Sequence, residues 1–123
     1  MLHIDALSRE PIYEQITRQI ETFILTGVLQ AGEQIPSVRQ LSLSESINPR
    51  TILKAYGDLD ARGIIVAVPG KGYFVAEDAV KRLSAGKREK LQTFLALTEE
   101  LAVAGIGREE LEELITRVYD RKS

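Results

Sequence analysis

The sequence contains no cysteine, a single histidine and no long apolar segment. Without cysteine the chain forms no disulfides and offers no thiolate, a composition that fits a reducing cytoplasm. With His3 as its one histidine and no cluster of metal-ligand residues, the sequence predicts no metal centre, no cofactor and no enzymatic activity. No apolar run reaches about 18 residues and the N-terminus lacks a signal-peptide pattern, so we expect a cytoplasmic protein without a membrane partner.

The overall charge does not point to nucleic acid. The net charge of the chain is −2, and residues 1–78 carry 7 Lys and Arg against 10 Asp and Glu, a net charge of −3. Residues 39–71, in contrast, carry 5 basic and 3 acidic residues, a net charge of +2. Because phosphate contacts depend on where the charges are placed, this local excess keeps a nucleic-acid partner open.

Two helices are predicted before residue 46. Between Pro11 and Thr26 apolar residues recur at helical spacing and predict a scaffold helix; they are Ile12, Ile16, Ile20, Phe23 and Ile24. Ser37 and Gln40 have the spacing of a capping box, which predicts a second helix from Ser37 to about Glu45. Between the two helices, the residues before Pro36 favour a short extended segment.

A third helix is predicted from Pro49 to Arg62. Asn48 is a suitable cap, Pro49 fits the first helical position, and Gly63 can take the left-handed conformation that ends a helix. One face is apolar and is predicted to pack on the core: Ile52, Ala55, Tyr56 and Leu59. Away from that face lie Arg50, Thr51 and Lys54, a polar arrangement that suits the major groove of DNA. The second and third helices thus form a candidate helix-turn-helix.

A β-hairpin is predicted directly after the third helix. Residues 64–68 and 73–76 are two β-prone runs, and Pro69-Gly-Lys-Gly72 between them is rich in turn-forming residues. Lys71 lies at the tip, where it can contact DNA as the wing of a winged helix does. A nucleotide-binding loop is disfavoured, because the Gly-Lys pair of such a loop is followed by Ser or Thr, and Gly72 and Tyr73 follow Lys71 here.

The last part of the chain predicts two amphipathic helices. The first extends over residues 77–104, with a bend or break expected at Ala85-Gly86 or a new helix start just after it, and the second over residues 108–119. Their apolar faces are predicted to meet a second copy of the chain, since symmetric homodimers are the commonest oligomers. The predicted dimerisation residues are Leu91, Phe94, Leu95, Leu101, Leu111, Leu114, Ile115 and Val118.

Three motifs resemble the GntR family of transcription regulators. They are Pro36-Ser-Val-Arg-Gln-Leu41, Ile47-Asn-Pro-Arg-Thr-Ile-Leu-Lys-Ala-Tyr56 and Pro69-Gly-Lys-Gly-Tyr-Phe-Val75, and they follow the family's order over about residues 10–76. The tail of about 45 residues is similar to that of the YtrA-type subfamily, where the tail serves dimerisation. Two positions depart from the family: residue 45, usually leucine-like, is Glu45, and residue 46, often glycine, is Ser46.

The resemblance implies a mainly α-helical fold with a small β-hairpin wing: a winged helix-turn-helix domain, residues 1–76, and a helical dimerisation tail, residues 77–123. The expected function is that of a homodimeric repressor on a pseudo-palindromic operator in double-stranded DNA. The candidate DNA-binding residues are Arg39, Asn48, Arg50, Thr51, Lys54, Gly70 and Lys71. Two alternatives stay open: a winged-helix protein-interaction module without DNA binding, and a sensor that holds a small-molecule effector between tail and winged domain.

Overall fold

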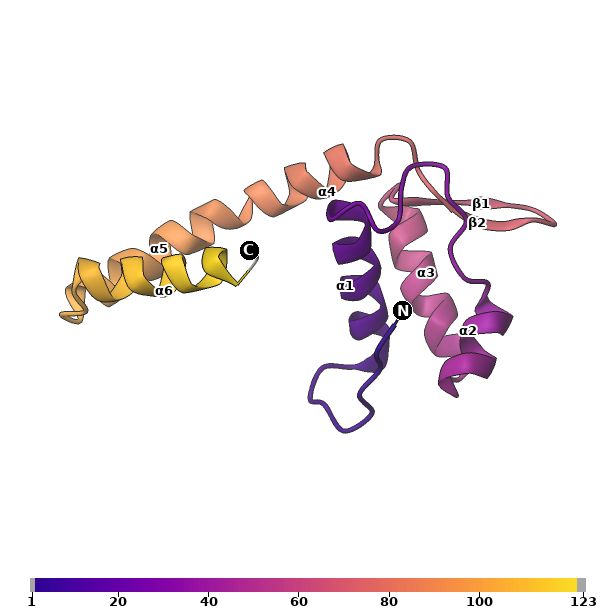
Figure 1. Ribbon diagram of the computed structural model, residues 1–123, viewed down its shortest axis with the longest axis horizontal. Helices are drawn as coiled ribbons and strands as arrows, with labels where there is room; N and C mark the ends of the chain where they lie inside the picture. Colours follow the sequence, from indigo (N-terminus) through magenta and orange to yellow (C-terminus); the bar gives the residue numbers. More distant parts are fainter. Residues whose placement is uncertain (1, 122–123) are drawn as a thin grey trace. The chain divides into compact units, whose positions relative to one another are not determined.

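The computed structural model describes residues 2–121, which fall into two compact units, Met1–Ala85 and Gly86–Ser123 (Figure 1). The elements follow one another in the order α1 (Ile12–Leu25), α2 (Val38–Glu45), α3 (Pro49–Ala61), β1 (Ile65–Val68), β2 (Gly72–Val75), α4 (Ala79–Arg88), α5 (Lys90–Val103) and α6 (Arg108–Asp120). This order confirms the predicted fold class, mainly α-helical with a β-hairpin directly after the third helix.

The core of the first unit forms around α3, because α1, α2 and β1 all contact it. Its buried apolar side chains include Ile16, Ile20 and Ile24 from α1, Leu41 from α2, and Ile52, Ala55 and Leu59 from α3. Tyr56 lies among them, fully buried, and its hydroxyl donates to the Pro36 carbonyl over 2.6 Å. The Tyr56 ring meets the Tyr73 ring edge to face, with centroids 5.0 Å apart. The predicted packing role of Tyr56 is therefore confirmed, and burial raises the pKa of its hydroxyl.

β1 and β2 form an antiparallel pair in which Ile65 lies opposite Val75 and Val68 opposite Gly72. The predicted extended segment before Pro36 is confirmed, because Gln34 bridges to Phe74 and the Ile35 N–H donates to the Tyr73 carbonyl. The connector between α1 and α2 therefore adds a short extended segment beside β2.

The predicted start of the first strand, Ile64, is wrong by one residue. The Ile64 N–H donates to Leu59 and the Gly63 N–H to Asp60, a pair of bonds that closes the end of α3 around Gly63 at φ +75°. Its N–H is used by the helix end, and only its carbonyl reaches the second strand, where it accepts from the Ala76 N–H over 3.0 Å. The strand β1 therefore begins at Ile65.

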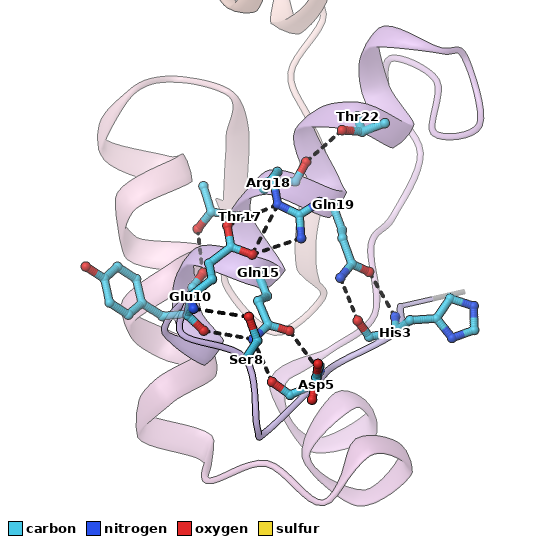
Figure 2. A network of polar contacts seen from close by, with 10 residues as sticks. His3, Asp5, Ser8, Glu10, Gln15, Thr17, Arg18, Gln19 and Thr22 are labelled. Atoms are coloured by element: carbon cyan, nitrogen blue, oxygen red, sulfur yellow. Dashed lines mark hydrogen bonds and ion pairs between the residues drawn. The ribbon is translucent and has the colours of Figure 1, made fainter. Parts of the chain in front are cut away.

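The N-terminal segment is held against α1 by two glutamine side chains (Figure 2). The Gln19 amide accepts from the His3 N–H over 2.9 Å and donates to the His3 carbonyl over 2.7 Å. The buried Gln15 amide does the same with Asp5, both bonds at 2.8 Å. Leu2 is buried by this docking, whereas Leu7 is 96% exposed.

The first unit extends beyond the predicted domain boundary after residue 76. Ala79 and Leu83 from the first turns of α4 are buried in the core of the winged domain. The two compact units accordingly divide after Ala85, within α4. The stretch 77–85 therefore packs as part of the winged domain.

The second unit is an αα-hairpin made of α5 and α6, joined by a turn in which Gly105 has φ +92°. The interruption lies slightly later than the expected place at Ala85-Gly86: Gly86 lies inside α4, and a new helix, α5, starts at Lys90 after Glu89, whose backbone still has helical angles. Gly86 takes an ordinary helical conformation there, so its cost in helix stability does not force a break. Across residues 2–121, no helix is both long and apolar enough to cross a membrane.

Candidate nucleic-acid interface

The start of α3 is built by its own first residues. The Asn48 side-chain oxygen accepts from the Arg50 N–H over 2.9 Å, and Pro49 occupies the first helical position. This cap confirms the predicted start of the helix, and it satisfies one of the backbone N–H groups that the first turn leaves without a helical partner. Arg50 and Lys54 are exposed and Thr51 is half-buried, while the opposite face of α3 is fully buried. The predicted division of α3 into a packed face and a polar face is confirmed.

The turn between α2 and α3 contains an unusual backbone conformation. Ser46 has φ +54° and ψ +46°, and among residues 2–121 it alone combines a side chain with a positive φ. The Ser42 hydroxyl donates to the Ile47 carbonyl over 2.7 Å and ties the turn to α2. Ile47 then enters the core, whereas Leu43 is 73% exposed. Ile47 therefore fills the core from the turn after α2, and Leu43 does not.

Arg39 lies in the first turn of α2, which begins with the predicted capping box. The Ser37 hydroxyl accepts from the Gln40 N–H over 3.0 Å, and the Gln40 side-chain oxygen accepts from the Ser37 N–H over 2.9 Å. The Glu33 carboxylate, the nearest acid in the preceding connector, accepts from the Gln30 N–H over 3.2 Å, and within residues 2–121 it forms no ion pair with Arg39. The Arg39 side chain is therefore exposed beside the start of α2.

The exposed side chain of Lys54 contacts an aromatic ring of α1. Its ammonium nitrogen lies 3.9 Å from the centre of the Tyr13 ring, which belongs to α1. Such a cation–π contact contributes about 0.5–1 kcal/mol at an exposed site. The Tyr13 hydroxyl donates to Glu14 over 3.2 Å, and this bond together with the nearby carboxylates raises the Tyr13 pKa. Lys54 is thus placed at the edge between α3 and α1, a contact that the sequence pattern did not predict.

The tip of the hairpin is a tight turn of residues 68–71. The Lys71 N–H donates to the Val68 carbonyl over 2.9 Å, Pro69 takes the second position, and Gly70 has φ +77°, as a type II turn requires. Lys71 is exposed at this tip. We call β1, β2 and the turn between them the wing. The predicted hairpin tip is confirmed, and Gly70 is needed there for its backbone conformation.

The tail carries the second candidate surface. Within residues 2–121, neither α5 nor α6 buries a side chain, and a groove of about 530 Å³ lies between the two helices. Five of the predicted dimerisation residues line this groove, Phe94, Leu101, Leu111, Leu114 and Ile115, together with Leu97 and Ile106, which the prediction omitted. Leu91, Leu95 and Val118 are outside its lining and are about half exposed.

The arrangement in the first unit defines a class of protein. A short helix, a tight turn and a second helix are followed by a β-hairpin (Figure 1). The start of the second helix is polar and exposed, and the hairpin tip carries Lys71. Arg39, Arg50 and Lys71 are carried by three successive elements of one rigid core, and all three are exposed. This is the architecture of a winged helix-turn-helix, a DNA-binding module.

Comparison with known proteins gives the family. Residues 12–75 match the model of the bacterial regulatory proteins of the gntR family. Over 119 residues the chain is 37% identical to the HTH-type transcriptional repressor YtrA of Bacillus subtilis, covering 96% of this chain and 92% of that protein. The chain belongs to the GntR family of DNA-binding transcriptional regulators.

Solved structures agree with the whole architecture. A GntR family transcriptional regulator from Listeria monocytogenes superposes with a TM-score of 0.73 at 32% identity, covering 89% of this chain and 96% of the other. AraR(DBD), whose structure is a complex with operator ORE1, has a TM-score of 0.52 at 30% identity and covers 60% of this chain with 100% of its own length. The first likeness includes the tail, whereas the second concerns the winged domain alone.

Proposed function

We propose that this protein is a homodimeric repressor that binds a pseudo-palindromic operator in the cytoplasm. The observation that carries the proposal is the division of α3: its rear face is fixed in the core and its exposed start presents Arg50 and Thr51. The similarity to YtrA of Bacillus subtilis, a transcriptional repressor, supports repression rather than activation.

Arg50 has the main reading role in this proposal. Its guanidinium can donate two parallel bonds to the edge of a guanine, which is worth about 1–3 kcal/mol of discrimination against another base. Thr51 lies beside it for a base or phosphate contact, and Asn48 fixes the start of the helix through its cap. Arg39 and Lys54 are assigned to phosphates, and Gly70 and Lys71 bring the wing tip to the adjacent groove. Contacts to phosphate position the protein on DNA, while contacts to bases give the sequence preference.

A second copy of the chain is needed for a palindromic site. In a symmetric dimer the two recognition helices enter major grooves about 34–36 Å apart, one turn of the double helix. The apolar groove between α5 and α6 is the surface that we assign to this contact, because three of its lining side chains, Phe94, Leu97 and Leu114, are about half exposed within one chain. A homodimer buries the same patch on both partners.

The test is a footprint on the DNA upstream of the protein's own coding region, followed by binding assays with the protected sequence. Arg50→Ala should weaken binding by about 1–3 kcal/mol and relax the preference at one base position. Arg82→Ala is the matched control, because Arg82 is exposed on α4 and lies beside Gly63, at the other end of α3. If Arg50→Ala keeps both affinity and preference, α3 does not read the operator.

The alternatives make different predictions. A protein-interaction module without DNA binding would give no salt-sensitive binding to any fragment of that upstream region. A sensor would lose operator binding on addition of a small-molecule effector, and this effector stays a prediction that the tail sequence does not specify.

A further inference from the structure

The side chain of Gln34 reaches the tip of the wing from outside it. Gln34 belongs to the connector between α1 and α2, and its Nε2 donates to the Lys71 carbonyl over 2.7 Å. Lys71 is the exposed basic residue of the tip, 37 positions further along the chain. The contact therefore joins the segment that leads into the helix-turn-helix to the residue that presents the wing's charge.

The base of this contact is rigid. The Gln34 backbone bridges to Phe74, the Ile35 N–H donates to Tyr73, and Glu33 and Val75 are joined by a bond from the Val75 N–H over 2.8 Å. Because these backbone bonds already fix the start of the side chain, binding of its amide to Lys71 costs only the rotamer entropy of the side chain itself, at most about 1.5–2 kcal/mol.

The wing is also shaped to admit the amide. Gly72 has φ +124°, and a Cβ added there would lie 2.8 Å from Gln34 Nε2, closer than real Cβ contacts occur. A residue with a side chain at this position would meet both backbone strain and the amide. Gly72 thus leaves the space in which the Gln34 amide lies against the tip.

We propose that Gln34 is a positioning residue for DNA binding: its amide clamps the Lys71 carbonyl and so fixes where the wing tip presents Lys71. The inference rests on the proposed DNA-binding role of the wing. Without the clamp the hairpin is held at its tip only by the turn bond from Lys71 to Val68 and by the end of the ladder. The tip then has more conformations in the free protein, and ordering it on DNA costs more entropy.

The clamp itself can be tested without DNA. Gln34→Met keeps the length of the side chain and removes the donor to the Lys71 carbonyl. The Lys71 N–H keeps its own bond to Val68 and so reports how often this turn opens. Without the clamp the turn should open more often, and the Lys71 amide should exchange with solvent about 3- to 10-fold faster in the free protein, since one hydrogen bond is worth about 0.5–1.5 kcal/mol. Gln30→Met is the matched control, because Gln30 is exposed in the same connector and contacts Glu33 only through its backbone. Unchanged exchange at Lys71 in Gln34→Met would overturn the proposal.

The functional half is tested by a double-mutant cycle on operator DNA. Gln34→Met should weaken binding about 3- to 10-fold in the wild-type background and have almost no effect in a Lys71→Ala background. Equal effects in both backgrounds would mean that Gln34 acts independently of Lys71 and would overturn the positioning role. If the wild-type protein binds no DNA, the proposed function fails, and the exchange measurement still decides whether the clamp exists.

Discussion

The guanidinium of Arg62 lies 2.8 Å from the carboxylate of Glu21, and this ion pair joins the end of α3 to the middle of α1. The Glu21 side chain is only 10% exposed, whereas the Arg62 side chain is 40% exposed and also contacts Asp58 over 2.9 Å. Burial by itself lowers the Arg62 pKa. The hydrogen bonds that Arg62 donates to the Glu21 and Asp58 carboxylates, together with their negative charges, outweigh burial and raise the pKa above its ordinary value. The recognition helix is therefore fixed to its scaffold by charge as well as by apolar packing.

Arg62→Ala should lower the free energy of unfolding by about 1–3 kcal/mol, because it removes a charged donor from a nearly buried carboxylate. Larger losses are known for fully buried pairs, and the partial exposure of Arg62 reduces the effect. Urea unfolding measures the change. Asp58→Asn is the control: Asp58 is half exposed, and its pair with Arg62 should contribute less than about 1 kcal/mol. Equal losses in the two variants would contradict the assignment of the main energy to Glu21.

Ser46→Gly should stabilise the protein. Ser46 has φ +54°, which costs a residue with a side chain about 1–2 kcal/mol, and glycine removes that cost. Part of the gain, about 0.4–1 kcal/mol, is lost because glycine makes the unfolded chain more flexible. We therefore expect a net gain of about 0.5–1 kcal/mol in thermal or urea unfolding.

The matched control for this change is Ser44→Gly, two residues earlier. Ser44 lies inside α2 with ordinary helical angles, so glycine there should cost up to about 0.5 kcal/mol relative to serine, which is itself a poorer helix former than alanine. The same substitution thus has opposite signs at the two serines. A loss of stability in Ser46→Gly would show that the turn needs the serine side chain more than it needs relief of its backbone.

Much of the winged domain was predictable because its signals are local. Asn48 and Pro49 begin α3 and Gly63 ends it, as their backbone preferences indicate, and the Ser37–Gln40 capping box forms as written in the sequence. The hairpin tip follows from the turn preferences of Pro69 and Gly70 in the same way.

The features that were missed depend on contacts between distant segments. The sequence around Lys54 does not indicate that α1 places the Tyr13 ring against its ammonium group. The sequence around Gln34 likewise does not indicate its bond to Lys71, which exists only when the hairpin has folded against the connector. The end of the winged domain was placed too early because the burial of Ala79 and Leu83 depends on the surface that the folded core offers. Periodicity within one helix does not contain this information.

Lys54→Ala should weaken operator binding across sequences and leave the base preference unchanged. Removing one phosphate contact should reduce the slope of log affinity against log salt by about 1, because one fewer counterion is released. Titrations of fluorescent operator between low and moderate salt measure this slope. Lys81→Ala is the control, since Lys81 is exposed on α4, away from the start of α3. If Lys54→Ala destabilises the fold but keeps the slope, Lys54 serves only to join α3 to Tyr13 of α1.

Leu114→Glu should separate the dimer. Leu114 lines the groove between α5 and α6 and is 46% exposed within one chain, so a carboxylate there would be buried at the interface without a partner. Light scattering should give twice 13.7 kDa for the wild-type protein and 13.7 kDa for the variant.

Operator affinity of the Leu114→Glu variant should fall more than about 10-fold, because two linked half-site contacts become independent. Thr116→Glu places the same charge at an exposed position outside the groove lining and should stay dimeric. A Leu114→Glu protein that remains dimeric and binds the operator normally would place the interface elsewhere on the chain.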